Sequence, residues 1–117
     1  MNWIDQTILE QLSLDAGNEL LPQLVTIFIE DGQKNLTELN QALEQHDIEK
    51  LLLLAHTMKS VCATYGATIC HGDAQQLEKA CRQLDWPQIT QRVAALRSSL
   101  QASNQALAEL IAEPHLS

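Results

Sequence analysis

Residues 48–66, with the sequence IEKLLLLAHTMKSVCATYG, decide the fold of this chain. When successive residues are placed 100° apart, the apolar side chains gather roughly 140–240° away from His56. They are Leu51, Leu54, Met58, Val61, Cys62 and Tyr65. This spacing predicts an amphipathic α-helix from Ile48 to Tyr65, which Gly66 is placed to end.

Four other segments have the same helical periodicity. We expect a short helix over residues 5–12, a break at 13–17, and a long helix from about 18 to the charged stretch at 44–47. Two more helices are expected from 67 or 68 to 84 and from 87 to about 110, after a turn at 85–87. Four long helices with short connections predict an all-α fold, an antiparallel four-helix bundle in up-down-up-down order. The short N-terminal helix is expected over one end, and a length of 117 residues predicts one domain, 1–117.

Composition argues against several kinds of partner. The chain has 7 basic and 15 acidic residues, a formal net charge of −8. Binding to nucleic acid or to an anionic membrane depends on Lys and Arg, so both partners are disfavoured. The N-terminus has no basic, apolar targeting pattern, and the longest apolar run, 51–55, is far short of a membrane span. Three cysteines without a secretory signal indicate reduced thiols and a cytoplasmic protein. We also expect a monomer.

His56 breaks the apolar pattern of the helix that contains it. The same 100° spacing places it away from the core stripe, among side chains that are small or aliphatic except for one lysine. These neighbours are Leu52, Leu53, Lys59, Ser60 and Ala63. A smooth face with little charge suits docking to another protein. An imidazole is a nucleophile near neutral pH, and Lys59 can attract a phosphoryl group to it.

Residues 55–67, AHTMKSVCATYGA, resemble the signature of histidine-containing phosphotransfer (HPt) domains, A-H-x-[LM]-K-[GS]-x-x-x-x-x-G-[AL]. Gln76-Leu77-Glu78 matches the L-E element of the next helix, and residues 20–31 are similar to the second helix of the family. The resemblance spans about residues 4–110. Within the family the chain is most similar to the LuxU-type phosphorelay proteins, in which the module is a separate polypeptide.

The resemblance implies that His56 is phosphorylated. HPt domains take a phosphoryl group from the aspartate of one receiver domain and pass it to another, here expected on a hybrid sensor kinase and a response regulator. The receiver brings the Mg²⁺, so this chain needs no cofactor and no kinase activity of its own. Lys59 matches the family lysine that assists electrostatically, and Ser60 stands where glycine is more common.

The resemblance also places two residues of the next helix near the histidine. Glu78 occupies the position, 22 residues after the histidine, that is commonly glutamine in the family. A carboxylate there can hold the imidazole at Nδ1 but repels a phosphoryl group, and Arg82, one turn later, can compensate. The receiver is expected to dock on the helix of His56 and on part of the first helix. The residues proposed for this contact are Leu52, Leu53, Ser60, Ala63, Ile8, Leu9 and Leu12.

Three alternatives remain open. A metal site would draw on His46, His56, His71, His115, Cys62, Cys70 and Cys81, but their spacings match no common metal motif, so no metal is expected. A non-catalytic helical adaptor would give His56 no role in transfer. An autonomous kinase would need a glycine-rich nucleotide loop, which the sequence lacks.

Overall fold

The computed structural model describes residues 2–112, and all regular structure in this range is helical. His115, one of the metal-ligand candidates, lies outside the described residues. The five helices are α1 (Gln6–Ala16), α2 (Leu21–Glu44), α3 (Ile48–Thr64), α4 (Thr68–Arg82) and α5 (Trp86–Ala112). The chain is therefore all-helical in its described part, as the periodicity predicts.

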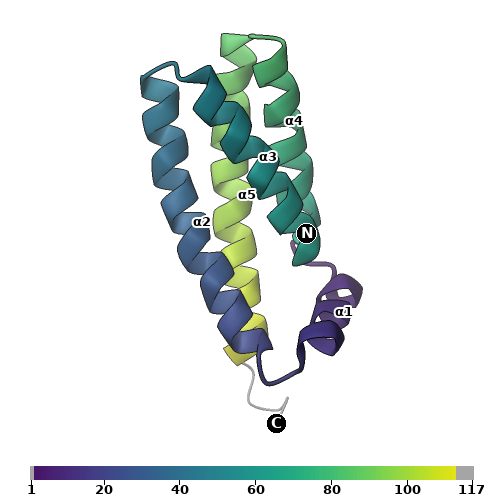
Figure 1. The fold of residues 1–117 in the computed structure, drawn as a ribbon. Coiled ribbons are helices and arrows are strands. Elements are labelled where there is room, and N and C mark those ends of the chain that lie inside the picture. The colour runs from purple at the N-terminus through teal and green to yellow at the C-terminus, as the bar shows by residue number, and fades with distance from the viewer. Residues whose placement is uncertain (1, 113–117) are drawn as a thin grey trace.

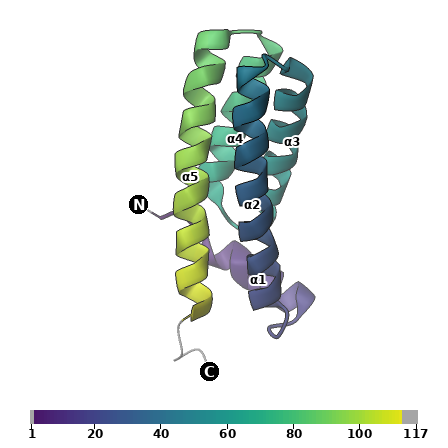
Figure 2. The ribbon, with the colours of Figure 1, turned by 90° about the vertical axis from the view of Figure 1, so that its left-hand side faces the viewer.

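The four longer helices lie side by side (Figures 1 and 2). Each of α2, α3, α4 and α5 packs against two of the others, because α3 contacts α2 and α4, and α5 contacts α4 and α2. The colour gradient in Figure 1 shows that the direction reverses from each of these helices to the next. The molecule is elongated, with extents of 47 × 24 × 21 Å.

The helices differ in length, and this determines where α1 lies. α2 and α5 contain 24 and 27 residues, whereas α3 and α4 contain 17 and 15. At 1.5 Å per residue the first two span about 36–40 Å and the other two only about 22–26 Å. One end of α2 and α5 therefore extends beyond α3 and α4, and α1 lies at that end, in contact with α2 and α3 (Figure 1).

Gly66, in the turn between α3 and α4, anchors the start of α1. The backbone N–H of Asp5 donates to the carbonyl of Gly66 over 2.7 Å. Gly66 has a φ of +76°, and a Cβ at this position would lie 2.6 Å from the carbonyl oxygen of Asp5. Asp5 also caps α1, because its carboxylate accepts from the backbone N–H groups of Thr7 and Ile8. The glycine thus permits both the turn and the close approach of the N-terminal segment.

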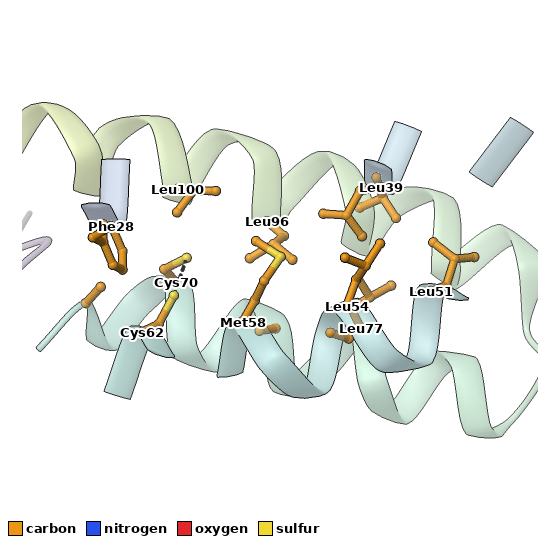
Figure 3. Close-up of a cluster of buried hydrophobic side chains, with 14 of the residues drawn as sticks. Phe28, Leu39, Leu51, Leu54, Met58, Cys62, Cys70, Leu77, Leu96 and Leu100 are labelled. Atoms are coloured by element: carbon orange, nitrogen blue, oxygen red, sulfur yellow. Dashed lines mark hydrogen bonds between the residues drawn. The ribbon is translucent and has the colours of Figure 1, made fainter. Parts of the chain in front are cut away.

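The core runs along the axis of α2–α5. Its largest fully buried side chains are Leu39, Leu51, Leu77, Ile89, Leu96, Leu100, Leu107, Val25, Val93, Cys62, Cys70 and Cys81. Figure 3 shows the middle of this core, where the side chain of Met58 extends from α3 toward Leu96 of α5. The apolar face of α3 predicted from the spacing around His56 is thus largely buried, and Ala55 joins it.

The ends of several helices differ from the predicted ones. α4 ends at Arg82 and not at residue 84. α1 includes residues 13–16, predicted to form a break, and continues to Ala16. It ends where Gly17 adopts a φ of +98°. α2 begins at Leu21 and not near residue 18. α5 begins at Trp86, within the expected turn, and the carboxylate of Asp85 accepts from the backbone N–H of Gln88 at its start.

Two residues are wrongly assigned by the sequence analysis. Val61, predicted in the core, is 38% exposed, because it lies on the rim of a groove between α2 and α3 with a volume of about 430 Å³. Phe28, Met58 and Tyr65 also line this groove. Leu9, proposed for docking, is buried in the core and is unavailable to a partner.

We predict opposite effects of alanine at two glycines. Gly66→Ala should lower the free energy of unfolding by about 2 kcal/mol, because alanine is strained at positive φ and its Cβ meets the Asp5 carbonyl. Gly72→Ala, inside α4 with open space around its Cβ, should raise it by about 0.5–1 kcal/mol. Urea denaturation followed by circular dichroism measures both. Equal effects of the two substitutions would show that Gly66 is not required for the anchor.

Candidate functional site

His56 lies on the solvent side of α3, with its side chain 61% exposed. Leu53, Ser60 and Ala63 are exposed beside it, and Leu52 is half-buried against the core. We call Leu52, Leu53, His56, Ser60 and Ala63 the His56 face. Leu53 is 60% exposed, which is a large fraction for a leucine. The face is thus open and mostly uncharged, as its spacing along the helix predicts.

Glu78 of α4 connects the two helices at this site. Its Oε2 lies 2.9 Å from Nδ1 of His56 and accepts a hydrogen bond from Arg82 over 3.3 Å. Its Oε1 accepts from Nζ of Lys59 over 2.7 Å. The Glu78 side chain is only 9% exposed, so hydrogen bonds from these donors, rather than water, stabilise its negative charge. The structure thus brings together His56, Lys59, Glu78 and Arg82, which we call the charged cluster.

Glu78 is ionised over the whole physiological pH range. The hydrogen bond from Lys59 is the largest cause that lowers its pKa, to about 2 from an ordinary 4.5. Burial acts in the opposite direction, and His56, the charge of Lys59 and Arg82 lower the pKa further. An ionised carboxylate can only accept hydrogen bonds, so Nδ1 of His56 carries the proton in this contact. The lone pair of the imidazole is then on Nε2, on the ring's other nitrogen.

His71 of α4 also contacts the backbone of the site, a role that the sequence did not predict. Its Nδ1 lies 2.9 Å from the backbone carbonyl of Lys59, to which Nδ1–H donates. His71 precedes Glu78 by two helical turns and so shares its face of α4. That spacing is a signal in the sequence, although it does not identify a backbone carbonyl as the partner. His71 therefore fixes α4 against α3 close to Lys59.

The α1 residues proposed for docking lie at the edge of this region. Ile8 and Leu12 are half-buried, and the Cβ of Ile8 would be 3.2 Å from a Cβ at Gly66. Gly66 follows His56 by ten residues, which corresponds to about 15 Å along a helix. Ile8 therefore lies well away from His56, near the turn between α3 and α4, and a contact of Ile8 or Leu12 with a receiver stays a prediction.

Within residues 2–112, no group of three or more His, Cys, Asp or Glu side chains is placed to hold a metal ion. In the same part of the chain no helix is long and apolar enough to cross a membrane. The site is an exposed imidazole beside two cations and a nearly buried carboxylate. Such an arrangement can present a nucleophile to a reactive group that another molecule carries.

We predict that Glu78→Gln lowers stability at neutral pH but not in acid. The pKa of Glu78 lies below its ordinary value in the folded chain, so its ionic contacts contribute fully above about pH 4.5 and are lost as the pH falls through 2. The two proteins should differ by an amount on the order of 1 kcal/mol at pH 7, and converge near pH 2. Urea midpoints at several pH values test this. A difference independent of pH would contradict the ionic role of Glu78.

Comparison with known proteins gives one consistent result. The family model of the Hpt domain matches residues 23–110. The Phosphorelay protein LuxU of Vibrio cholerae is 24% identical over 109 residues, which cover 93% of this chain and 96% of that protein.

Solved structures share the fold. A putative histidine-containing phosphotransfer protein from rice superimposes with a TM-score of 0.79 at 20% identity, covering 93% of this chain and 81% of the other. The HPT domain of a sensor hybrid histidine kinase from Shewanella gives a TM-score of 0.76 at 16% identity, covering 95% and 92%. The match to the family model extends over most of the chain and includes His56, Lys59 and Glu78. The chain therefore belongs to the Hpt domain family, the histidine-containing phosphotransfer proteins of two-component signalling.

Proposed function

We propose that this protein carries a phosphoryl group on Nε2 of His56 between the aspartates of two receiver domains, one of a hybrid sensor kinase and one of a response regulator. One observation carries the proposal. The imidazole is exposed, and a nearly buried carboxylate holds its Nδ1, so that a single nitrogen is free to react. An exposed surface histidine without a function does not need such a partner.

The proposed reaction needs little from this chain beyond that nitrogen. Nε2 forms a bond to phosphorus as the bond from phosphorus to the aspartate oxygen breaks, and the aspartate leaves as a carboxylate. The imidazole becomes positively charged, with its proton still on Nδ1, and the Glu78 carboxylate 2.9 Å away stabilises that charge. Transfer to the second receiver reverses these steps. We expect the receiver to supply Mg²⁺ for charge neutralisation, and we expect no autonomous kinase activity from this chain.

Lys59 and Arg82 are assigned an electrostatic role. Both already contact Glu78, at 2.7 and 3.3 Å. With a neutral His56 the charged cluster has a net charge of +1, although the chain as a whole carries −8. A receiver that presents an acidic pocket would therefore meet a locally positive surface. The two cations also offset the repulsion between Glu78 and an incoming phosphoryl group.

The architecture fits this role. We infer that α2–α5 form an antiparallel up-down-up-down four-helix bundle and that residues 1–117 make one domain, which acts as a monomer in the cytoplasm. The alternating directions and pairwise contacts of the four helices support the bundle. In a bundle, His56 stands on one outer face, where a receiver can reach it without any change in the core.

The proposal predicts that His56→Gln abolishes phosphoryl acceptance while the fold is kept. The full chain is mixed with a receiver domain carrying a labelled aspartyl phosphate, and the label on this chain should be acid-labile and base-stable. His46→Asn, in the turn between α2 and α3, is the matched control and should accept label normally, because asparagine tolerates the positive φ of this residue. Label that reaches the His56→Gln chain would rule out the assignment and favour a non-catalytic adaptor.

The docking proposal predicts that a large side chain at position 63 slows phosphoryl transfer. A receiver seated over His56 would cover the exposed Ala63 two turns further on, together with Leu52, Leu53 and Ser60. Ala63→Arg should slow transfer at least about tenfold, because a long charged side chain costs 1.4 kcal/mol or more at a closely packed contact. Ala94→Arg, also exposed but on α5, should transfer at the normal rate. Equal rates for the two variants would show that the receiver docks elsewhere.

A further inference from the structure

Two of the three cysteines meet in the core between α3 and α4. The thiol of Cys62 donates a hydrogen bond to Sγ of Cys70, and the two sulfur atoms are 3.1 Å apart (Figure 3). Both are free and completely or almost completely buried, at 1% and 0% exposure. A disulfide bond is about 2.05 Å long, so the sulfurs are roughly 1 Å from bonding distance.

The backbone on both sides of this pair is fixed by the turn between the helices. The N–H of Ala67 donates to the carbonyl of Cys62 over 2.9 Å, which ties Cys62 to the first residues of α4. The N–H of His71 donates to the carbonyl of Ala67, and its ring donates to the carbonyl of Lys59. The bond from Ala67 to Cys62 and the bond from the His71 ring to Lys59 join α3 to the start of α4 close to both cysteines. The close approach of the sulfurs is therefore a property of the turn and of the helix packing.

We propose that Cys62 and Cys70 are a modification site, at which a reversible intramolecular disulfide joins α3 to α4. The oxidant is a small disulfide such as oxidised glutathione. One cysteine thiolate attacks this disulfide, the S–S bond breaks and one glutathione thiolate leaves. The second cysteine then attacks the protein sulfur of the mixed disulfide and releases the second glutathione. Two cysteine thiols are oxidised, one glutathione disulfide is reduced, and the two thiol protons pass to the two glutathione thiolates.

Burial of the two thiols determines how fast the disulfide can form, and the close approach of the two sulfur atoms determines how stable the disulfide is. The hydrogen bond to Cys70, together with burial, raises the pKa of Cys62 far above its ordinary value, so the attacking thiolate is scarce in the closed fold. Oxidation then requires a brief opening of the turn and is slow. At equilibrium, however, the folded chain holds the sulfurs next to each other, whereas the unfolded chain does not. The proposal is therefore tested by the equilibrium between the dithiol and the disulfide, and not by the rate of oxidation.

Cys81 provides an internal control. It is buried in α4 about three turns beyond Cys70, which corresponds to about 16 Å along the helix. That separation is far beyond the reach of a disulfide. The structure therefore predicts one pairing, Cys62 with Cys70, and leaves Cys81 as a thiol.

The test measures this equilibrium on the full chain. The protein is incubated to equilibrium in a series of reduced and oxidised glutathione mixtures, folded or in concentrated urea. It is then quenched with acid, alkylated and weighed, and proteolytic peptides identify the bonded cysteines. We expect the folded chain to become half-oxidised at a ratio of reduced to oxidised glutathione at least roughly ten times more reducing than the unfolded chain. In the folded state Cys81→Ser should behave like the natural chain, and Cys70→Ser should form no intramolecular bond.

Two results would overturn the proposal. In one, the bond forms no more readily in the folded chain than in urea. In the other, Cys81 takes part in it. The comparison between the natural chain and Cys81→Ser does not depend on whether Cys70→Ser folds. No step of the test uses phosphoryl transfer, so its outcome is separate from that of the function proposed for His56.

Discussion

The Glu78 carboxylate is the contact on which the arrangement of the site depends. A nearly buried anion must be hydrogen-bonded, and here the donors come from α3 (His56 and Lys59) and from α4 itself (Arg82). The Glu78 carboxylate fixes the proton on Nδ1 of His56, sets the orientation of the imidazole ring and holds Lys59 beside the ring. Helix packing and reaction chemistry are therefore joined in one side chain. The bond from His71 to the Lys59 carbonyl adds a second tie between the same two helices.

Much of the fold could be predicted from the sequence, because helical periodicity is a local property. The apolar residues of α3 repeat at intervals that only a helix brings to one side, and Gly66 ends the pattern where the chain must turn. The exposed position of His56 follows from the same spacing, since a residue opposite the buried stripe of an amphipathic helix faces solvent. Periodicity does not determine the ends of α1 and α2, because residues such as Ser13 and Asp15 are compatible with both a helix and a loop.

The contacts within the site depend on facts that no single helix contains. Glu78 could be placed near His56 only through resemblance to a family, because the relative register of α3 and α4 is a property of their packing. The three donors of its carboxylate, the bond from His71 to a backbone carbonyl and the approach of Cys62 to Cys70 all depend on that register and on side-chain rotamers. Val61 shows the same limit, since its angle on the helix is nearly that of the core, yet it lines the groove between α2 and α3 and stays 38% exposed.

Because the helices are unequal in length, α1 covers one end of the core at a distance from His56 and Glu78. The match to the Hpt family begins at residue 23, within α2, so α1 lies outside it. α1 closes the end of the core that α3 and α4 are too short to reach, and the Asp5–Gly66 bond holds it there. Substitutions on its outer surface change the contour offered to a partner without moving the imidazole and its carboxylate. The outline of the molecule at this end can therefore change while the geometry around His56 stays the same.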